Sequence, residues 1–219
     1  MDRVLRGITP VGEPEFGICD FCGCVSHTTL LQFNEDGNKI GCQSCQVHIY
    51  GTMKEMKNRP FYKKVLEFAT EAHLGQFRKP PDREPYIEHP IRVSNGAVEH
   101  WMNKFPAVAT PGSLIIIAAI GLLHDIVEDT GVTIDELRKF LYSIDDDTVS
   151  QLQKDQIVGS VKLLTRMNKS ELVVPYVLGI KEDSFARVVK LEDLNDNTKD
   201  LSDGNLLDKY QLIKYILTS

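Results

Sequence analysis

Over most of the chain, apolar residues recur every three or four positions, which places them on one face of an α-helix. This spacing predicts one helix around Phe61 to Ala72 and a second from about Glu88 to Lys104. The longest apolar stretch, Leu114 to Leu123, predicts a buried helix that ends near Glu128. Ser113 stands directly before this stretch, and we expect its hydroxyl to cap the helix.

Further helices are predicted toward the C-terminus. Thr133-x-x-Glu136 is a capping-box pattern and predicts the start of a short helix. Longer helices are expected over Asp145 to Leu164, Asp183 to about Leu194 and Leu206 to Leu217. The acidic triplet at 145–147 fits the start of the first of these, because negative charge is favourable at the positive end of the helix dipole. No strand is predicted here, so the pattern indicates an all-α bundle.

The first fifty residues differ, because they hold all five cysteines of the chain. Two CxxC pairs stand nineteen residues apart, and Asn34 to Gly37 predicts a hairpin turn between them. Four thiolates at such spacing are typical of a tetrahedral Zn²⁺ site, and the metal would supply much of the folding free energy of so short a module. We therefore expect a zinc-ribbon-like module over residues 1–52, followed by a helical domain over 53–219, with these structural zinc ligands: Cys19, Cys22, Cys42 and Cys45.

Other uses of these cysteines are redox pairs or free thiols, which the repetition of CxxC disfavours. Cys24 is the odd thiol, and His27 and His48 are alternative ligands. Lys39 is the only basic residue between the first and last of the predicted ligands. The module is therefore expected to contact a protein partner or a second copy of the chain rather than nucleic acid.

The composition is that of a globular protein, with 42% hydrophobic and 26% charged residues. The net charge of −6 disfavours broad binding to DNA or RNA, which usually requires a basic surface. The N-terminus has no apolar run typical of a signal peptide, and the longest apolar stretch is too short to span a bilayer. We expect a cytoplasmic protein without membrane contact, in which thiols stay reduced.

The central chemical motif is His124-Asp125-Ile-Val-Glu128-Asp129, at the end of the apolar helix. Four ionisable groups after a buried stretch need compensation, and metal coordination is one means to achieve it. At 100° per residue, His124 and Glu128 lie on nearly the same helix face, and Asp125 lies one step round. The alternative is a helix end that simply reaches solvent, with a histidine satisfied by hydrogen bonds.

Other segments in a fixed order distinguish between these interpretations. They are Ala-x-x-Ala-His-x-Gly-Gln-x-Arg-Lys at 69–79, Tyr-Ile-x-His-Pro at 86–90, His-Asp-x-Val-Glu-Asp-Thr at 124–130 and Val-Lys-Leu-x-Asp-x-x-x-Asn at 189–197. Together they resemble the HD hydrolase domain of the Rel/Spo family, in particular the small Mesh1-like alarmone hydrolases that lack a synthetase domain. The resemblance covers roughly residues 60–200 and implies the helical bundle of the HD superfamily.

The resemblance also implies a metal site made by two histidines and two aspartates: His89, His124, Asp125 and Asp193. Such a mixed nitrogen and oxygen site suits Mn²⁺ or another divalent ion, which can acidify a bound water and polarise a phosphoryl group. Glu128 and Asp129 match the acidic pair that would manage the attacking water and the leaving-group proton. The reaction would be hydrolysis of the 3′-diphosphate of (p)ppGpp to pyrophosphate and GDP or GTP.

The nucleotide contacts implied by the resemblance are five: Arg78, Lys79, Tyr86, Lys190 and Asn197. His73 is interpreted either as a pocket residue or as a core histidine. Leu194 replaces the arginine that is usual after the family's aspartate, and Asp200 and Asp203 are acidic where polar or apolar residues are expected near guanine. These departures concern base specificity more than phosphohydrolase chemistry.

Three alternatives stay open at this point. The same site chemistry would serve another nucleotide, such as NADPH or a deoxynucleoside triphosphate. The helical domain could instead be a nucleotide-sensing module that is coupled to a partner through the zinc module, although a pure sensor need not keep Glu128 and Asp129. The zinc module acting as a nucleic-acid adaptor is the weakest alternative, because of the acidic charge balance.

Overall fold

A computed structural model describes the backbone of residues 16–18, 25–27, 31–33 and 39–42, and residues 53–79, 83–166, 172–199, 201 and 204–219 with their side chains. The chain divides into two compact units, Met1–Gly51 and Thr52–Ser219. Each unit is described by itself below.

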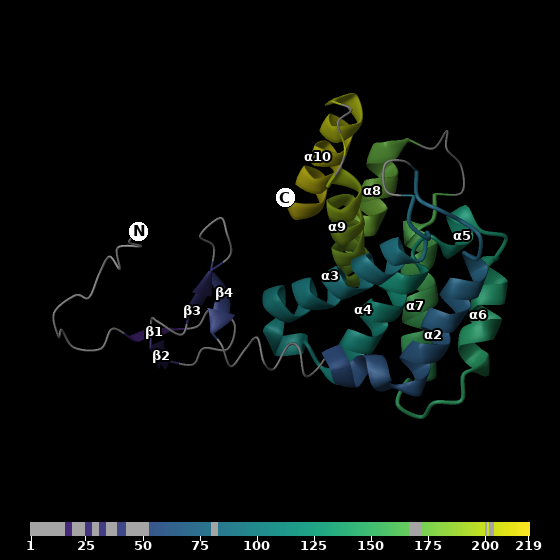
Figure 1. Cartoon of the computed structure of the whole chain (residues 1–219), viewed down its shortest axis with the longest axis horizontal. Helices are drawn as coiled ribbons and strands as arrows, with labels where there is room; N and C mark the ends of the chain where they lie inside the picture. The colour runs from purple at the N-terminus through teal and green to yellow at the C-terminus, as the bar shows by residue number, and fades with distance from the viewer. Residues whose placement is uncertain are drawn as a thin grey trace, which may run out of the picture. The chain divides into compact units, whose positions relative to one another are not determined.

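The N-terminal unit contains two short antiparallel strand pairs. β1 (Phe16–Ile18) pairs with β2 (Val25–His27), and β3 (Leu31–Phe33) pairs with β4 (Lys39–Cys42) (Figure 1). The second pair lies on either side of 34–37, as expected for the predicted hairpin there. Cys42 ends β4, but its side chain and the whole of Cys19, Cys22 and Cys45 lie outside the described residues.

The C-terminal unit is helical, apart from one isolated bridge between Phe77 and Pro85 among its described residues. Residues 53–58 are helical. The elements that follow are α2 (Pro60–Ala72), α3 (Glu88–Lys104), the 3-10 turn η2 (Pro106–Val108), α4 (Pro111–Leu123), α5 (Ile126–Asp129), α6 (Ile134–Ser143), α7 (Gln151–Leu164), α8 (Val173–Glu182), α9 (Ser184–Thr198) and α10 (Gly204–Thr218). The bounds of α3 are those predicted from the spacing of its apolar residues.

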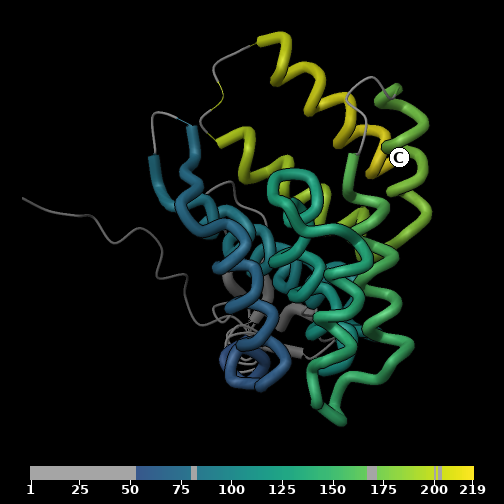
Figure 2. The backbone as a smooth tube through the Cα atoms, turned by 90° about the vertical axis from the view of Figure 1, so that its right-hand side faces the viewer, coloured from purple at the N-terminus to yellow at the C-terminus, as the bar shows by residue number. Residues whose placement is uncertain are grey.

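Helix α4 forms the centre of the helical unit and packs against α2, α3, α7 and α9 (Figures 1 and 2). All ten residues from Leu114 to Leu123 are buried. The stretch Pro111–Asp129 is long and apolar enough to cross a membrane, but 67% of its most apolar window is buried inside the unit, as in the core helix of a folded domain.

Gly121 allows α3 and α4 to approach closely. A Cβ atom at this position would lie 2.6 Å from the Cα of Ser94, a distance that side chains do not tolerate. The Ser94 hydroxyl donates to the carbonyl of Ala118 across the same contact, at 2.9 Å. This crossing brings the first turn of α3 toward the end of α4, where the ionisable motif begins.

Two predicted helix starts are wrong. The cap of α4 is Thr110, whose hydroxyl accepts the Ser113 N–H, and Pro111 occupies the first turn, where its fixed φ favours the helix. Helix α7 begins at Gln151 and not at Asp145, because Ser150 and Gln153 form a capping box there. The capping box predicted at Thr133 is confirmed. Helix α8 was not predicted.

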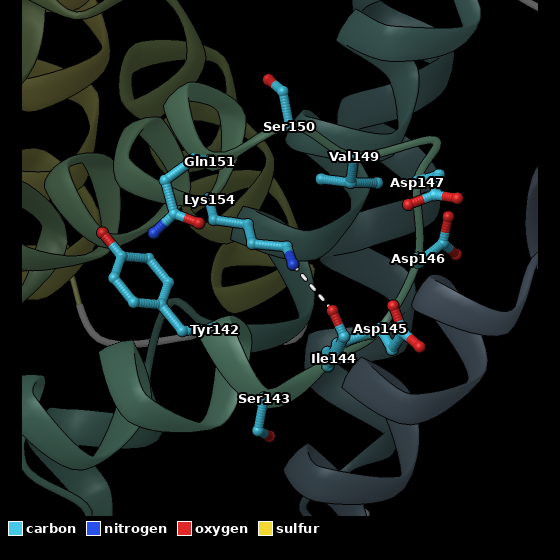
Figure 3. A pocket seen from close by; sticks show the side chains of 10 residues that line it. All are labelled: Tyr142, Ser143, Ile144, Asp145, Asp146, Asp147, Val149, Ser150, Gln151 and Lys154. Carbon is cyan, nitrogen blue, oxygen red and sulfur yellow. Dashed lines mark hydrogen bonds between the residues drawn. The ribbon is translucent and has the colours of Figure 1, made fainter.

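The acidic triplet at 145–147 therefore lies in the loop before α7. Asp146 accepts hydrogen bonds from the backbone N–H of Phe61 at 3.1 Å and from the N–H and hydroxyl of Thr148. The loop borders a hollow of about 370 Å³, where the buried Lys154 donates to the carbonyl of Ile144 (Figure 3). This hollow shares no residue with the predicted metal site.

Candidate metal centre

Three helices position the four predicted metal ligands. His89 lies in the first turn of α3, and His124 and Asp125 form the break between α4 and α5. Asp193 lies in α9, which packs against both α3 and α4. Both residues of the dipeptide keep right-handed helical dihedrals, and their side chains lie one step apart around the helix axis.

The four side chains lie within a few ångströms of one another. His124 Nε2 is 3.1 Å from Asp125 Oδ2 and 3.7 Å from Asp193 Oδ1. His89 Nε2 is 3.5 Å and 3.3 Å from the same two oxygens. One ligand atom each of His89, His124 and Asp125 falls within 4.8 Å of the others. The structure thus brings together residues that are separated by more than one hundred positions in sequence.

Both imidazoles direct Nε2 toward the carboxylates of this cluster. His124 Nδ1 lies 2.8 Å from the carbonyl of Gly121, which can only accept, so Nδ1 carries the proton and the buried Nε2 has no hydrogen-bond partner. His89 Nδ1 likewise lies 2.7 Å from Asp196 Oδ2. In the neutral imidazoles, lone pairs therefore face carboxylate oxygens, and the cluster needs positive charge among its four groups.

The pKa shifts have the same physical origin. Burial by itself lowers the pKa of His124, but the carboxylates of Asp125 and Asp193 outweigh burial and raise it to about 10. Burial is also outweighed at His89, whose pKa rises to about 9 through hydrogen bonds to Asp125, Asp193 and Asp196. The cluster attracts positive charge, as protons or as a cation. The donor set and the orphaned Nε2 fit a divalent metal ion.

Glu128 and Asp129 lie beside the cluster. Burial raises the pKa of Glu128, although the backbone N–H of Arg166 donates to its carboxylate at 3.1 Å. The hydroxyl of Tyr86 lies 2.7 Å from Asp129 Oδ2 and 2.8 Å from Asp125 Oδ2. Tyr86 thus connects a metal-side carboxylate to the second acid of the pair.

Basic and amide side chains border the other side of Asp193. Lys190 Nζ lies 2.7 Å from Asp193 Oδ2, and Asn197 donates to Asp193 Oδ1. Burial lowers the pKa of Lys190, but the charge of Asp193 raises it more, so its ammonium stays protonated. Arg78 follows Gly75, whose positive φ of 79° turns the chain after α2, and donates to Asn197 Oδ1 at 2.9 Å. Lys79 is exposed.

Comparison with known proteins assigns the chain to a family, although no family model matches it. Human guanosine-3′,5′-bis(diphosphate) 3′-pyrophosphohydrolase MESH1 is 31% identical over 138 residues, which are 63% of this chain and 68% of the human protein. The chain belongs to the MESH1 family. The Xenopus tropicalis member is 29% identical over 139 residues, or 63% of this chain and 67% of that protein.

Two bacterial relatives of this MESH1-family chain are much longer. The Borreliella burgdorferi 3′-pyrophosphohydrolase is 28% identical over 155 residues, which are 70% of this chain and 21% of that protein. The Spiroplasma citri protein of the same name is 31% identical over 162 residues, which are 70% of this chain and 18% of that protein. A solved structure of a metazoan orthologue of SpoT that hydrolyses ppGpp has a TM-score of 0.52 and 24% identity, covering 73% of this chain and 84% of that one. This likeness supports the fold.

Two residues near the site were missed from the sequence. The buried Asp196 and the partly exposed Arg92 form an ion pair behind His89, with Arg92 Nε 2.8 Å from Asp196 Oδ1. The motif that carried the family resemblance leaves position 196 open. The available signal was spacing, because Asp196 lies three residues after Asp193 and on the same face of α9.

The remaining predicted features fall in different places. His73 is buried, stacks on Tyr86 with ring centroids 4.9 Å apart and contacts Gln76, so it lies next to the cluster. Leu194 is buried in the core of the unit, so the position of the missing family arginine holds an apolar side chain. Asp200 and Asp203 lie outside the described residues.

Proposed function

We propose that the helical unit removes pyrophosphate from the 3′-diphosphate of (p)ppGpp and yields GDP or GTP. One observation carries this proposal: the Nε2 atoms of two buried imidazoles face the carboxylates of Asp125 and Asp193, at 3.1 Å and 3.3 Å, in a cluster that holds either protons or a cation. Such a site suits a divalent cation, and relatives that are 29% and 31% identical to the chain bear the name of this hydrolase.

The proposed metal is Mn²⁺ or another divalent ion, with His89, His124, Asp125 and Asp193 as ligands. When bound, it would supply an acidified water and a polarised phosphoryl group. The raised pKa of Glu128 suits a residue that takes a proton from water near neutral pH. Asp129, held by the Tyr86 hydroxyl, is positioned to manage the proton of the leaving group.

We assign substrate binding to residues around Asp193. The half-buried Lys190 ammonium is available to phosphate oxygens at the edge of the proposed metal cluster. Arg78 can stack on a base or bind phosphate, and Asn197 holds its guanidinium beside the cluster. Tyr86 provides an aromatic face and a hydroxyl there, and the exposed Lys79 adds positive charge at the rim.

The function is tested with a panel of nucleotides: ppGpp, pppGpp, NADPH and dGTP. Each is incubated with the Mn²⁺-loaded full chain, and products are identified by ion-exchange chromatography. We expect pyrophosphate with GDP from ppGpp and with GTP from pppGpp, and no reaction after chelation. Cleavage of NADPH or dGTP with intact ppGpp would overturn the alarmone substrate and leave the phosphohydrolase. Tight nucleotide binding without any product would instead indicate a sensor.

For the N-terminal unit we propose a structural Zn²⁺ held by Cys19, Cys22, Cys42 and Cys45, in a module that contacts a protein partner or a second copy. The two strand pairs support this, because the first CxxC directly follows β1 and Cys42 ends β4. Metal analysis should find one Zn²⁺ per chain, lost in Cys42→Ser and kept in the matched control Cys24→Ser. Equal zinc content in the two variants would contradict the ligand assignment.

A further inference from the structure

The two histidines of the cluster are oriented by different groups. His124 donates through Nδ1 to a neutral backbone carbonyl of its own helix. His89 donates through Nδ1 to the carboxylate of Asp196, at 2.7 Å, across the contact between α3 and α9. A carboxylate behind a ligating imidazole makes the opposite nitrogen more basic than a carbonyl does. The Nε2 atoms of His89 and His124 are therefore not equivalent as ligands.

The charge of Asp196 is itself buried and compensated. Only 4% of its side chain is exposed. Arg92 binds both of its oxygens, with Nε at 2.8 Å from Oδ1 and Nη2 at 3.0 Å from Oδ2, and Lys199 adds a contact at 3.0 Å. Two-point contact fixes the plane of the carboxylate and so the direction in which it accepts from His89.

The chain of contacts continues to the loop that carries Arg78. Arg92 binds Glu84 through both terminal nitrogens, and the carbonyl of Glu84 accepts the backbone N–H of Arg78 at 2.9 Å. Arg78 also reaches Asp193 through Asn197. The loop is thus joined to two proposed metal ligands by two separate hydrogen-bonded routes.

We infer that Asp196 is a positioning residue for the metal: it holds His89 with Nε2 toward the cluster, and Arg92 holds Asp196. This rests on the proposed metal site and adds a residue that the family motif does not contain. Loss of Asp196 lets the ring rotate and removes a negative charge one side chain away from the metal. Weaker metal binding follows, by about 10- to 100-fold for an outer-shell partner of a ligating histidine.

Helix α9 contains a matched control for this inference. One turn before Asp196, Glu192 accepts from His100 Nδ1 at 2.7 Å, which is the same kind of carboxylate–histidine pair between the same two helices. His100 is not a proposed metal ligand. Breaking a carboxylate–histidine pair between α3 and α9 in Glu192→Gln therefore tests the effect on helix packing alone, at a more exposed pair with 28% and 17% side-chain exposure.

The test is a Mn²⁺ titration of the full chain, followed by the loss of the free-ion electron paramagnetic resonance signal. Asp125→Ala sets the background from other sites. We expect Asp196→Ala to raise the Kd by 10- to 100-fold. Asp196→Asn should raise it less, because the amide oxygen still accepts from His89, and Arg92→Gln less again. Glu192→Gln should bind as wild type does.

Thermal unfolding without metal separates positioning from folding. A merely structural role predicts that Asp196→Asn lowers the unfolding temperature and leaves the Kd of the folded protein unchanged, which would overturn the inference. Asp196→Asn is nearly isosteric, so it decides the matter if the alanine variant does not fold. A wild-type protein that binds no Mn²⁺ above the Asp125→Ala background would contradict the proposed metal site itself. That result differs from a failure of the Asp196 inference, in which the wild type still binds Mn²⁺.

Discussion

Two acidic regions of the helical unit differ in what surrounds their carboxylates. In the metal cluster, Asp125 and Asp193 face imidazole nitrogens that carry no proton when neutral. In the loop at 145–147, Asp146 faces no imidazole and accepts from the N–H of Phe61 and from the N–H and hydroxyl of Thr148. The loop has three consecutive acids, yet the donors of the protein satisfy its central one. Asp193 also accepts from Lys190 and Asn197, so the two buried imidazoles beside the carboxylates, and not the number of acids, distinguish the proposed cation site from this loop.

Removing one acid from each region tests this difference most directly. Asp125→Ala should lower kcat for (p)ppGpp by at least about 10³-fold, because it removes a metal ligand and several kcal/mol of transition-state stabilisation. Asp146→Ala should leave kcat unchanged. Both are measured as pyrophosphate release with saturating Mn²⁺. Equal losses in both variants would show that the effect is on folding and not on the cluster.

The next largest effect concerns the acid pair. Glu128→Gln removes a group that can accept a proton but keeps its size, so we expect kcat to fall by about 10²- to 10⁴-fold. Because Glu128 is not among the four proposed ligands, the Mn²⁺ titration should match that of the wild type. Loss of Mn²⁺ binding in this variant would instead make Glu128 a ligand.

The pH dependence of stability should have opposite signs in the two regions. Without metal, the raised pKa values of His89 and His124 give stability that is fully present below about pH 6.5 and is lost as the pH rises through about 9 to 10. Added Mn²⁺ should remove this decline, because the cation replaces the protons. Urea unfolding between pH 6 and pH 10, with and without Mn²⁺, measures it. A flat profile without metal would contradict the charge balance of the cluster.

For Asp146 the sign is reversed. Burial by itself raises the pKa of Asp146. The hydrogen bonds from Thr148 and from the N–H of Phe61 outweigh burial, so the pKa lies below its ordinary value. Its stability contribution is present above the ordinary pKa of an aspartate and is lost as the pH falls through the lowered one. Asp146→Asn should cost about 1 kcal/mol near pH 7 and less in acid. This is the smallest effect, and an equal cost at all pH values would contradict it.

Much of the helical unit followed from apolar spacing and capping patterns. The bounds of α3 and the capping box at Thr133 could be predicted because they depend on neighbours within one or two turns. The start of α7 could not, because three acids favour a helix start but the serine at 150 captures the first free N–H groups. Helix α8 was missed because its apolar residues lack a clear period, and it is held by packing against α7, α9 and α10.

Local pattern and motif order were sufficient to predict the helical class, the cysteine-rich first segment and the identity of the candidate site residues. These features depend on residue type and spacing. Only tertiary packing decided that Asp196 stands behind His89 and that Asp146 is satisfied by Phe61, because a hydrogen bond joins atoms that are near in space whatever their separation in sequence. The close crossing of α3 and α4 at Gly121 likewise brings His89 and His124 together, with ring centroids 5.2 Å apart.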